Sequence, residues 1–289
     1  MSTLHFELGH DGVALLSIDV HGRPMNVLTL ELITELDAAI QRIQTDAAIK
    51  GAIITSAKPG SFLAGTDLKD LTTAHDRGMT PAQATLVSSQ VSGLFRKLET
   101  CGKPIAAVIN GPALGSGLEL CLACHYRVLS DDPKAVIGFP EVKVGVLPGA
   151  GGTQRLPRLV GIPAALPLLL QDRSLPPAEA LTVGLVHEVA AHSDLFDTAR
   201  RWLSTSPKAS QPWDQKTFTI PGGAGPLAPH ANQTFVAGTA LLASNRGDDY
   251  PTRLAILSCV YEGTMVAFDV GLRIESKYFG KLLGYSGVA

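Results

Sequence analysis

The sequence predicts an α/β protein whose central sheet is mostly parallel. Short apolar runs of strand length alternate with longer segments in which apolar residues recur every three or four positions, as in amphipathic helices. Glycine-rich turns follow several of these strands, which is typical of the passage from a strand into a helix. A chain of 289 residues is also long enough to bury a substantial core.

The first strand–helix–strand passage lies near the N-terminus. Residues 13–20 form an apolar run between glycine-containing turns and predict a strand. An amphipathic helix follows, with Thr29 at the N-cap position. Its apolar face consists of Leu32, Leu36, Ile40 and Ile43. Residues 52–55 then predict a short buried strand.

The later elements continue this alternation. Helices are expected after Asp67, over residues 82–98, after the glycine-rich segment 149–153 and after Ser174. Strands are expected over residues 103–109, 125–129, 135–139 and 184–189. The pattern becomes helical again from Tyr250 to about Leu283.

The composition predicts three regions along the chain. Residues 1–204 carry the alternating strands and helices and should form the core. Residues 205–250 are rich in proline and glycine and are expected to be a linker. Residues 251–289 are expected to form C-terminal helices.

Charge and hydropathy exclude several classes of protein. The formal net charge is -2, so neither nucleic acid nor an anionic membrane is an expected partner. No apolar run is long enough to span a bilayer, and the N-terminus lacks the pattern of a signal peptide. We therefore expect a cytoplasmic protein.

The four cysteines are too few for a disulfide scaffold. The segment from Cys121 to His125 matches C-x-x-C-H, the attachment pattern of c-type haem. The two thiols lie one turn apart in an apolar helix, where buried structural cysteines are the usual case. We expect buried thiols here, and no metal.

The most informative stretch runs from Asn110 to Leu120, N-G-P-A-L-G-S-G-L-E-L. A glycine-rich turn around Ser116 follows an apolar strand and opens an apolar helix that contains Glu119. Backbone N–H groups at a helix start have no intrahelical acceptor and can hold an oxyanion. A carboxylate beside them favours proton transfer next to a polarised carbonyl, although the helix dipole alone could also explain Glu119.

Two further segments could complete such a site. Glu141 follows a short strand and a proline turn, and two carboxylates that face one cleft can divide acid and base roles. The loop from Ser61 to Asp67 offers a second set of N–H groups just before a helix. A solvated glutamate and an ordinary connecting turn are the structural alternatives.

Several motifs in this order resemble the enoyl-CoA hydratase/isomerase (crotonase) superfamily. They are S-F-x-A-G-x-D, K-P-I-A-A-V-I-N-G, A-L-G-S-G-L-E-L, F-P-E-V-K-V-G and L-P-G-A-G-G-T-Q-R-L, between about Val13 and Val189. The resemblance implies a spiral of β-β-α units followed by C-terminal helices. It implies hydration of trans-2-enoyl-CoA to 3-hydroxyacyl-CoA in fatty-acid β-oxidation.

The resemblance also implies roles for individual residues. Glu119 and Glu141 would be the catalytic pair, and the backbone N–H groups of Ala64 and Ser116 would form the oxyanion hole. The residues along the CoA moiety would be Ala64, Gly65, Thr66, Asp67, Gly115 and Ser116. CoA is then part of the substrate, and no separate cofactor is expected; no dinucleotide-binding fingerprint is present.

The C-terminal part resembles the hydratase half of multifunctional fatty-acid oxidation proteins. The segments concerned are Gln211–Asp214, Ile220–Gly223 and Arg273–Phe279. This resemblance leaves three functions open: a hydratase, a Δ3-Δ2 enoyl-CoA isomerase, or a fragment active only with a dehydrogenase region or a thiolase subunit. A homo-oligomer is also open.

Overall fold

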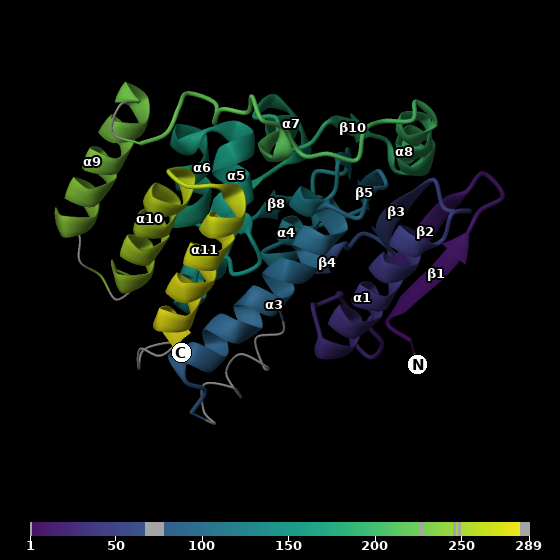
Figure 1. Cartoon of the computed structure of the whole chain (residues 1–289), viewed down its shortest axis with the longest axis horizontal. Helices are drawn as coiled ribbons and strands as arrows, with labels where there is room; N and C mark the ends of the chain where they lie inside the picture. Colours follow the sequence, from purple (N-terminus) through teal and green to yellow (C-terminus); the bar gives the residue numbers. More distant parts are fainter. Residues whose placement is uncertain (1, 67–77, 226–227, 245–246, 248–249, 284–289) are drawn as a thin grey trace. The chain divides into compact units, whose positions relative to one another are not determined.

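The computed structural model describes residues 2–66, 78–225, 228–244, 247 and 250–283 (Figure 1). Contacts divide the chain into two compact units, each made of three separate stretches. The first, which we call the sheet unit, comprises Met1–Asp67, Leu94–Ile137 and Leu175–Gln211. The second, the helical unit, comprises Leu68–Gly93, Gly138–Ser174 and Pro212–Ala289. This division differs from the predicted succession of core, linker and C-terminal helices.

The sheet unit is built on a six-stranded sheet in the order β1-β2-β3-β5-β7-β10. The strands are β1 (Leu4–Leu8), β2 (Val13–Ile18), β3 (Gly51–Ser56), β5 (Ile105–Ile109), β7 (Tyr126–Ser130) and β10 (Glu188–Ala190). Among the described strands of this sheet, only β1 and β2 pair in the antiparallel direction. The prediction of a mostly parallel sheet is confirmed.

Helices cover this sheet. Helix α1 (Leu30–Thr45) packs against β1 and β2, and α8 (Leu195–Ser204) packs against β5 and β7. Thr29 caps α1, since its hydroxyl accepts a hydrogen bond from the Leu32 N–H at 3.2 Å. The predicted apolar face of α1 is buried. A buried cluster joins the sheet to α8 and includes Ile53, Val108, Val128, Leu195 and Ala199.

A second sheet has the order β4-β6-β8-β9. Its strands are β4 (Leu63–Ala64), β6 (Ala113–Leu114), β8 (Ile137–Gly138) and β9 (Ser174–Leu175). Each has two residues, so the strand expected over 135–139 is present in shortened form. The short helices α4 (Ser116–Ala123) and α7 (Pro177–Thr182) and the 3-10 turn η2 (His192–Asp194) complete the sheet unit.

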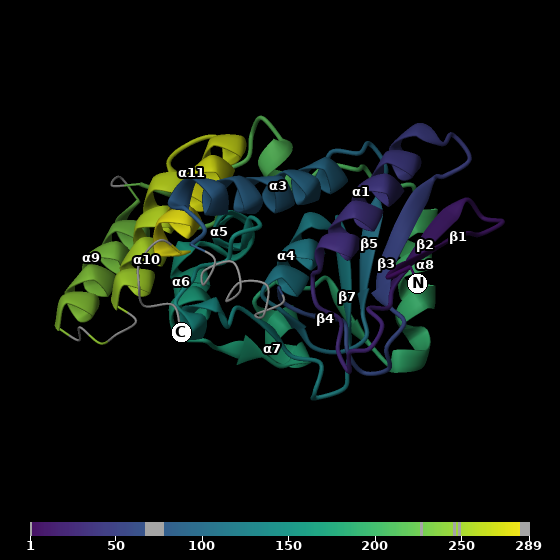
Figure 2. The same cartoon turned by 90° about the horizontal axis from the view of Figure 1, so that it is seen from below.

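The helical unit contains the 3-10 turns η1 (Glu141–Val144) and η3 (Pro212–Asp214) and most of the long helices. These are α5 (Gly152–Val160), α6 (Ile162–Leu170), α9 (Pro229–Ser244), α10 (Tyr250–Thr264) and α11 (Phe268–Leu283). Helix α3 (Pro81–Glu99) contributes residues to both units. Helices α10 and α11 lie side by side and both contact α5 (Figure 2).

The region 205–250, predicted as a proline- and glycine-rich linker, contains the helix α9, which the sequence analysis did not predict. Pro229 begins this helix, and proline is tolerated in the first turn because its missing N–H would have had no intrahelical partner. The alanine- and leucine-rich stretch behind it favours the helical conformation. The expected helix after Asp67 lies outside the described residues.

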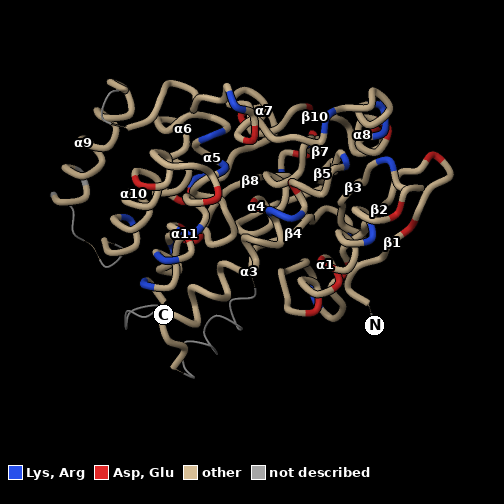
Figure 3. The backbone as a smooth tube through the Cα atoms, in the orientation of Figure 1, with Lys and Arg blue, Asp and Glu red and all other residues tan. Residues whose placement is uncertain are grey.

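Basic and acidic residues are both distributed over the described elements. Figure 3 shows Lys and Arg residues interspersed with Asp and Glu along these elements. Among the described residues, no helix combines the length and hydropathy needed to cross a membrane.

Candidate active site

The start of α4 forms the centre of the candidate site in the sheet unit. Gly115 caps the helix with φ 53° and ψ -125°, a conformation that favours glycine. Ser116 is the first helical residue, and the Glu119 N–H donates to the Gly115 carbonyl at 3.0 Å. The N–H of Ser116 therefore precedes the first intrahelical hydrogen bond and belongs to the donors that a helix cannot satisfy itself.

Glu119 lies in the first turn of α4 and is 2% exposed. Every residue of the helix is buried, including the neighbouring Leu118 and Leu120. Burial of a carboxylate among apolar side chains costs free energy unless a partner or a function compensates for it. The sequence predicts Glu119 in an apolar helix, and the structure shows it buried there.

The loop from Ser61 to Thr66 lies directly against this helix start. Strands β4 and β6 pair in parallel, with Leu63 opposite Ala113 and Ala64 opposite Leu114. The Thr66 hydroxyl donates to the Ser116 hydroxyl at 3.3 Å. The two loops that the sequence singled out are therefore neighbours. Gly65, with φ 83°, provides the turn between Ala64 and Thr66.

The N–H of Ala64 is already used in this structure. It donates to the carbonyl of Asn26 at 2.9 Å, and the Leu28 N–H donates to the carbonyl of Gly65 at 2.9 Å. These bonds fix the loop against the segment that follows β2. A role of the Ala64 N–H as an oxyanion donor stays a prediction, and it requires the bond to Asn26 to open.

Asn26 is a residue that the sequence analysis missed. It is completely buried, and its amide group donates to the carbonyl oxygens of Ile18 and Phe62 and to the Ser56 hydroxyl. Its side-chain oxygen accepts from the Val20 N–H at 2.9 Å. Asn26 thus ties the end of β2 to the candidate loop. The sequence shows only an asparagine shortly after Pro24, and asparagines near turns usually hydrogen-bond to the backbone of the turn itself.

Glu141 lies in the helical unit, as the first residue of η1. Gly145 ends this turn with φ 78°, and its N–H donates to the carbonyls of Glu141 and Val142. The Thr252 hydroxyl of α10 donates to the Gly145 carbonyl at 2.9 Å. Lys143 and Asp172 form an ion pair beside the turn. The turn that carries Glu141 is therefore fixed at both its end and its flank.

The segment after Glu141 is attached to α3 and α11. The Ser88 hydroxyl of α3 donates to the Gly149 carbonyl at 2.6 Å. Glu275 of α11 is completely buried and accepts from the N–H groups of Gly151 and Thr153, at 2.5 and 2.9 Å. This carboxylate satisfies donors at the start of α5 that the helix leaves unpaired. In the sequence, Glu275 stood out only as a member of the segment Arg273–Phe279.

The C-x-x-C-H pattern has a structural explanation. All four cysteines, which lie among the described residues, are buried and unpaired by disulfides. The Ile105 N–H donates to Nδ1 of His125 at 3.1 Å, and Nε2 lies 3.1 Å from the Glu99 carbonyl. Both ring nitrogens are thus engaged with backbone groups. The prediction of buried thiols is confirmed.

The structure brings Ala64, Gly65, Thr66, Gly115, Ser116 and Glu119 together within the sheet unit. Glu141 belongs to the other unit, and Asp67 lies outside the described residues.

This arrangement of motifs and elements can be compared with known proteins. The family model for enoyl-CoA hydratase/isomerase matches residues 10–213. The chain belongs to the enoyl-CoA hydratase/isomerase family. The matched residues include the loop before Thr66, the start of α4 and the turn that carries Glu141.

Curated relatives of the family are longer than this chain. The chain is 41% identical to a fatty acid oxidation complex subunit alpha of Shewanella amazonensis over 273 residues, 94% of this chain and 38% of that protein. It is 37% identical to the protein of the same name from Shewanella sp. strain MR-4 over 284 residues, 97% of this chain and 39% of that protein. The chain therefore spans about two-fifths of their length.

Solved structures of the enoyl-CoA hydratase/isomerase family share the fold. An enoyl-CoA hydratase from Bacillus anthracis aligns with a TM-score of 0.64 and 27% identity, over 98% of this chain and 92% of that one. A human mitochondrial delta3-delta2-enoyl-CoA isomerase aligns with a TM-score of 0.64 and 26% identity, over 93% of this chain and 95% of that one. The expected crotonase fold, with its C-terminal helices, is confirmed.

Proposed function

We propose that the chain is an enoyl-CoA hydratase, which adds water to a trans-2-enoyl-CoA and forms the 3-hydroxyacyl-CoA. One observation carries this proposal. Glu119 is buried in the first turn of α4, beside backbone N–H groups that have no acceptor within the helix. A buried carboxylate next to an oxyanion site is suited to proton transfer at a carbon adjacent to a thioester carbonyl.

In the proposed reaction Glu119 and Glu141 hold one water. One carboxylate removes a proton from this water as its oxygen bonds to C3, and the electrons of the double bond move onto the thioester as an enolate. The other carboxyl group then delivers a proton to C2, which regenerates the carbonyl. The product thus contains the elements of one water molecule: a hydroxyl group on C3 and a proton on C2.

The enolate oxygen needs two hydrogen-bond donors. We assign the first to the Ser116 N–H at the start of α4. The second comes from the loop of Ala64 to Thr66. Because the Ala64 N–H donates to Asn26, this donor has to be released on substrate binding, or the neighbouring Thr66 N–H takes its place. Gly65, Asp67 and Gly115 would line the CoA moiety.

An isomerase is the second candidate within the same fold. Shifting a double bond needs one base that moves a proton between two carbons, whereas hydration as described uses two carboxylates. The similarity to a human enoyl-CoA isomerase favours this alternative, and the presence of both Glu119 and Glu141 favours hydration. A single chain can perform both reactions with the same oxyanion site.

Dependence on other polypeptides is the third candidate. The Shewanella relatives are named as alpha subunits of a fatty acid oxidation complex and are longer than this chain. By analogy, the chain would have one of three partners: a dehydrogenase region, a thiolase subunit or a second copy of itself. We propose that it acts in the cytoplasm. The role in β-oxidation belongs to this proposal.

The test is hydration of crotonyl-CoA, followed by the loss of absorbance of the conjugated thioester. Glu119→Gln should lower turnover by about a hundredfold or more, as expected for a general acid or base, while binding of an acyl-CoA analogue persists. Glu31→Gln is the matched control, because Glu31 also lies in the first turn of a helix but is exposed. Turnover of Glu119→Gln near that of the wild type would contradict the proposed role.

A further inference from the structure

A group of potential metal ligands lies away from the candidate active site. Among the described residues, His5, Asp19 and His21 place one ligand atom each within 4.8 Å of one another. They belong to three consecutive segments of the sheet unit: the edge strand β1, the residue after β2 and the turn that follows. None of them takes part in the proposed hydration.

The strand register explains why the three side chains converge. His5 lies opposite Ser17 in the antiparallel β1–β2 pair, and the Asp19 N–H donates to the Thr3 carbonyl at 2.8 Å. Because side chains alternate between the two faces of a strand, His5 and Asp19 share a face as diagonal neighbours. His21 follows Asp19 by two residues and lies beside it.

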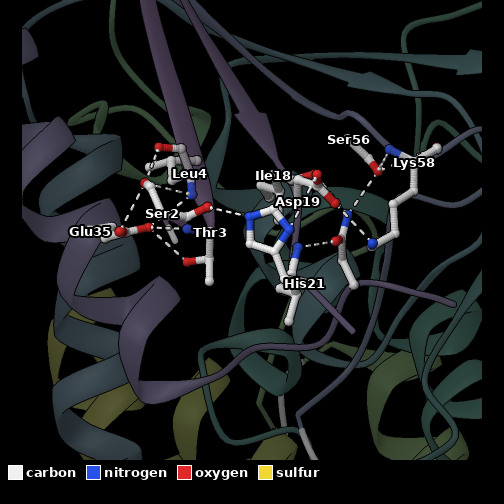
Figure 4. Close-up of polar contacts among 11 residues, drawn as sticks. Ser2, Thr3, Leu4, Ile18, Asp19, His21, Glu35, Ser56 and Lys58 are labelled. Atoms are coloured by element: carbon white, nitrogen blue, oxygen red, sulfur yellow. Dashed lines mark hydrogen bonds and ion pairs between the residues drawn. The ribbon is translucent and has the colours of Figure 1, made fainter. Parts of the chain in front are cut away.

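His21 is oriented by its other ring nitrogen. Figure 4 shows its ring between Ser2 and Asp19, and Nε2 lies 3.0 Å from the Ser2 carbonyl. A carbonyl oxygen can only accept, so this contact requires a proton on Nε2, which in a neutral ring leaves the lone pair on Nδ1. Metal-binding histidines commonly donate their second ring N–H to a backbone carbonyl in this way.

The nitrogen with the lone pair faces the carboxylate. Nδ1 of His21 lies 3.9 Å from Oδ2 of Asp19, which is longer than a direct hydrogen bond. In a tetrahedral site with bonds of about 2.1 Å, two ligand atoms are roughly 3.4 Å apart. Small side-chain rotations would therefore suffice to close the site around an ion.

Asp19 retains one oxygen for such an ion. Its Oδ1 accepts from the Lys58 ammonium at 2.9 Å, as Figure 4 shows, so that Oδ2 is the oxygen on the histidine side. The Lys58 charge opposes a cation at this position, which makes binding weaker than in a buried site. It also fixes the carboxylate, as hydrogen bonds to ligating carboxylates do in metal sites.

We propose that His5, Asp19 and His21 form a surface site for a divalent transition-metal ion such as Zn²⁺. Two imidazoles and a carboxylate are the donor set that Zn²⁺ accepts, and water completes the coordination. The ion joins the edge strand β1 to the end of β2 and the next turn. Its binding stabilises the folded sheet unit, because only the folded chain brings the three ligands together.

The experiment is calorimetric titration of the full chain with Zn²⁺ alone, with the melting temperature measured at each metal concentration. The wild type should bind one ion per chain and melt at a higher temperature when loaded. His5→Ala and His21→Ala should each weaken binding about tenfold or more and abolish the shift in melting temperature. His5 is exposed, so its replacement should leave the metal-free fold intact, which circular dichroism would verify.

His10→Ala is the matched control. His10 is an exposed histidine in the turn between β1 and β2, outside the group of ligands. This variant should bind Zn²⁺ as the wild type does. The proposal is overturned if the wild type shows no saturable binding, or if His5→Ala and His21→Ala retain the affinity of the wild type.

Discussion

Gly117 lies so close to Leu63 that a Cβ atom on the glycine would be 2.1 Å from the Leu63 carbonyl oxygen. Its backbone conformation is helical, so the glycine is required by close approach and not by an unusual φ angle. This contact presses the first turn of α4 onto β4. It therefore helps to set the separation of Ser116 and Thr66, whose hydroxyl groups bond to each other between the two loops of the proposed oxyanion site.

Gly117→Ala should separate these two elements. We expect overpacking to cost about 1–3 kcal/mol of unfolding free energy, measured by urea denaturation, and crotonyl-CoA turnover to fall further than stability alone explains. Gly93→Ala is the control, because Gly93 lies in α3 with open space around it and should gain about 0.5–1 kcal/mol. Full activity in Gly117→Ala would show that the spacing is unimportant.

Glu141→Gln should separate hydration from isomerisation. Hydration as proposed uses both carboxylates, whereas the shift of a double bond needs only one base. Turnover of crotonyl-CoA should therefore fall more than turnover of a trans-3-enoyl-CoA, assayed on the same preparation. An equal loss of both activities would argue against distinct roles for Glu119 and Glu141.

Thr252→Val should act on Glu141 from a distance. The substitution preserves shape but removes the donor to the Gly145 carbonyl, which ends the turn of Glu141. We expect a several-fold decrease in kcat with little change in KM, and recovery in Thr252→Ser.

Thr264→Val provides the comparison for Thr252. The Thr264 hydroxyl also lies on α10, and it donates to the carbonyls of Val260 and Tyr261 in its own helix. The kcat of Thr264→Val should equal that of the wild type. If Thr252→Val and Thr264→Val lose the same activity, the cause is a general effect on α10, and the proposed positioning of Glu141 by Thr252 is contradicted.

Glu35→Gln should change the acid stability of the sheet unit. Partial burial alone would raise the pKa of the Glu35 carboxyl, but hydrogen bonds from Thr3, Ser2 and Leu4 outweigh it and lower the pKa from its ordinary value of 4.5 (Figure 4). The ionised group therefore stabilises the fold above pH 4.5, and this stabilisation is lost as pH falls through the lowered pKa.

Urea denaturation at about pH 7 and about pH 3 measures this effect. The variant should be less stable than the wild type at the higher pH, and the difference should shrink at the lower one. Glu7→Gln is the control, because Glu7 is exposed on the same edge strand. A difference that is independent of pH would contradict a contribution from the Glu35 charge.

Local signals allowed much of the fold to be predicted. The N-cap Thr29 and the apolar face of α1 involve residues within a few positions of each other, so their pattern appears directly in the sequence. The same holds for the glycine turn before α4. Helix α9 was missed because a high proline and glycine content was taken to exclude a helix, although proline can begin one.

The remaining features depend on contacts between distant residues. The bond from Ala64 to Asn26 joins separate loops, and Glu275 reaches the start of α5 across more than a hundred positions. No periodicity encodes such pairs. For the same reason the sequence suggested Glu119 and Glu141 as candidates, whereas the residues that support them became apparent only in the structure.

The attachment of Glu141 to the C-terminal helices has a consequence for synthesis on the ribosome. Every stretch of the sheet unit has been translated once Gln211 is complete. Thr252 and Glu275 are translated later than Gln211. Domains generally fold as units as they emerge. The turn of Glu141 and the segment behind it therefore receive their bonds from Thr252 and Glu275 only after the helix of Glu119 and the rest of the sheet unit have been synthesised.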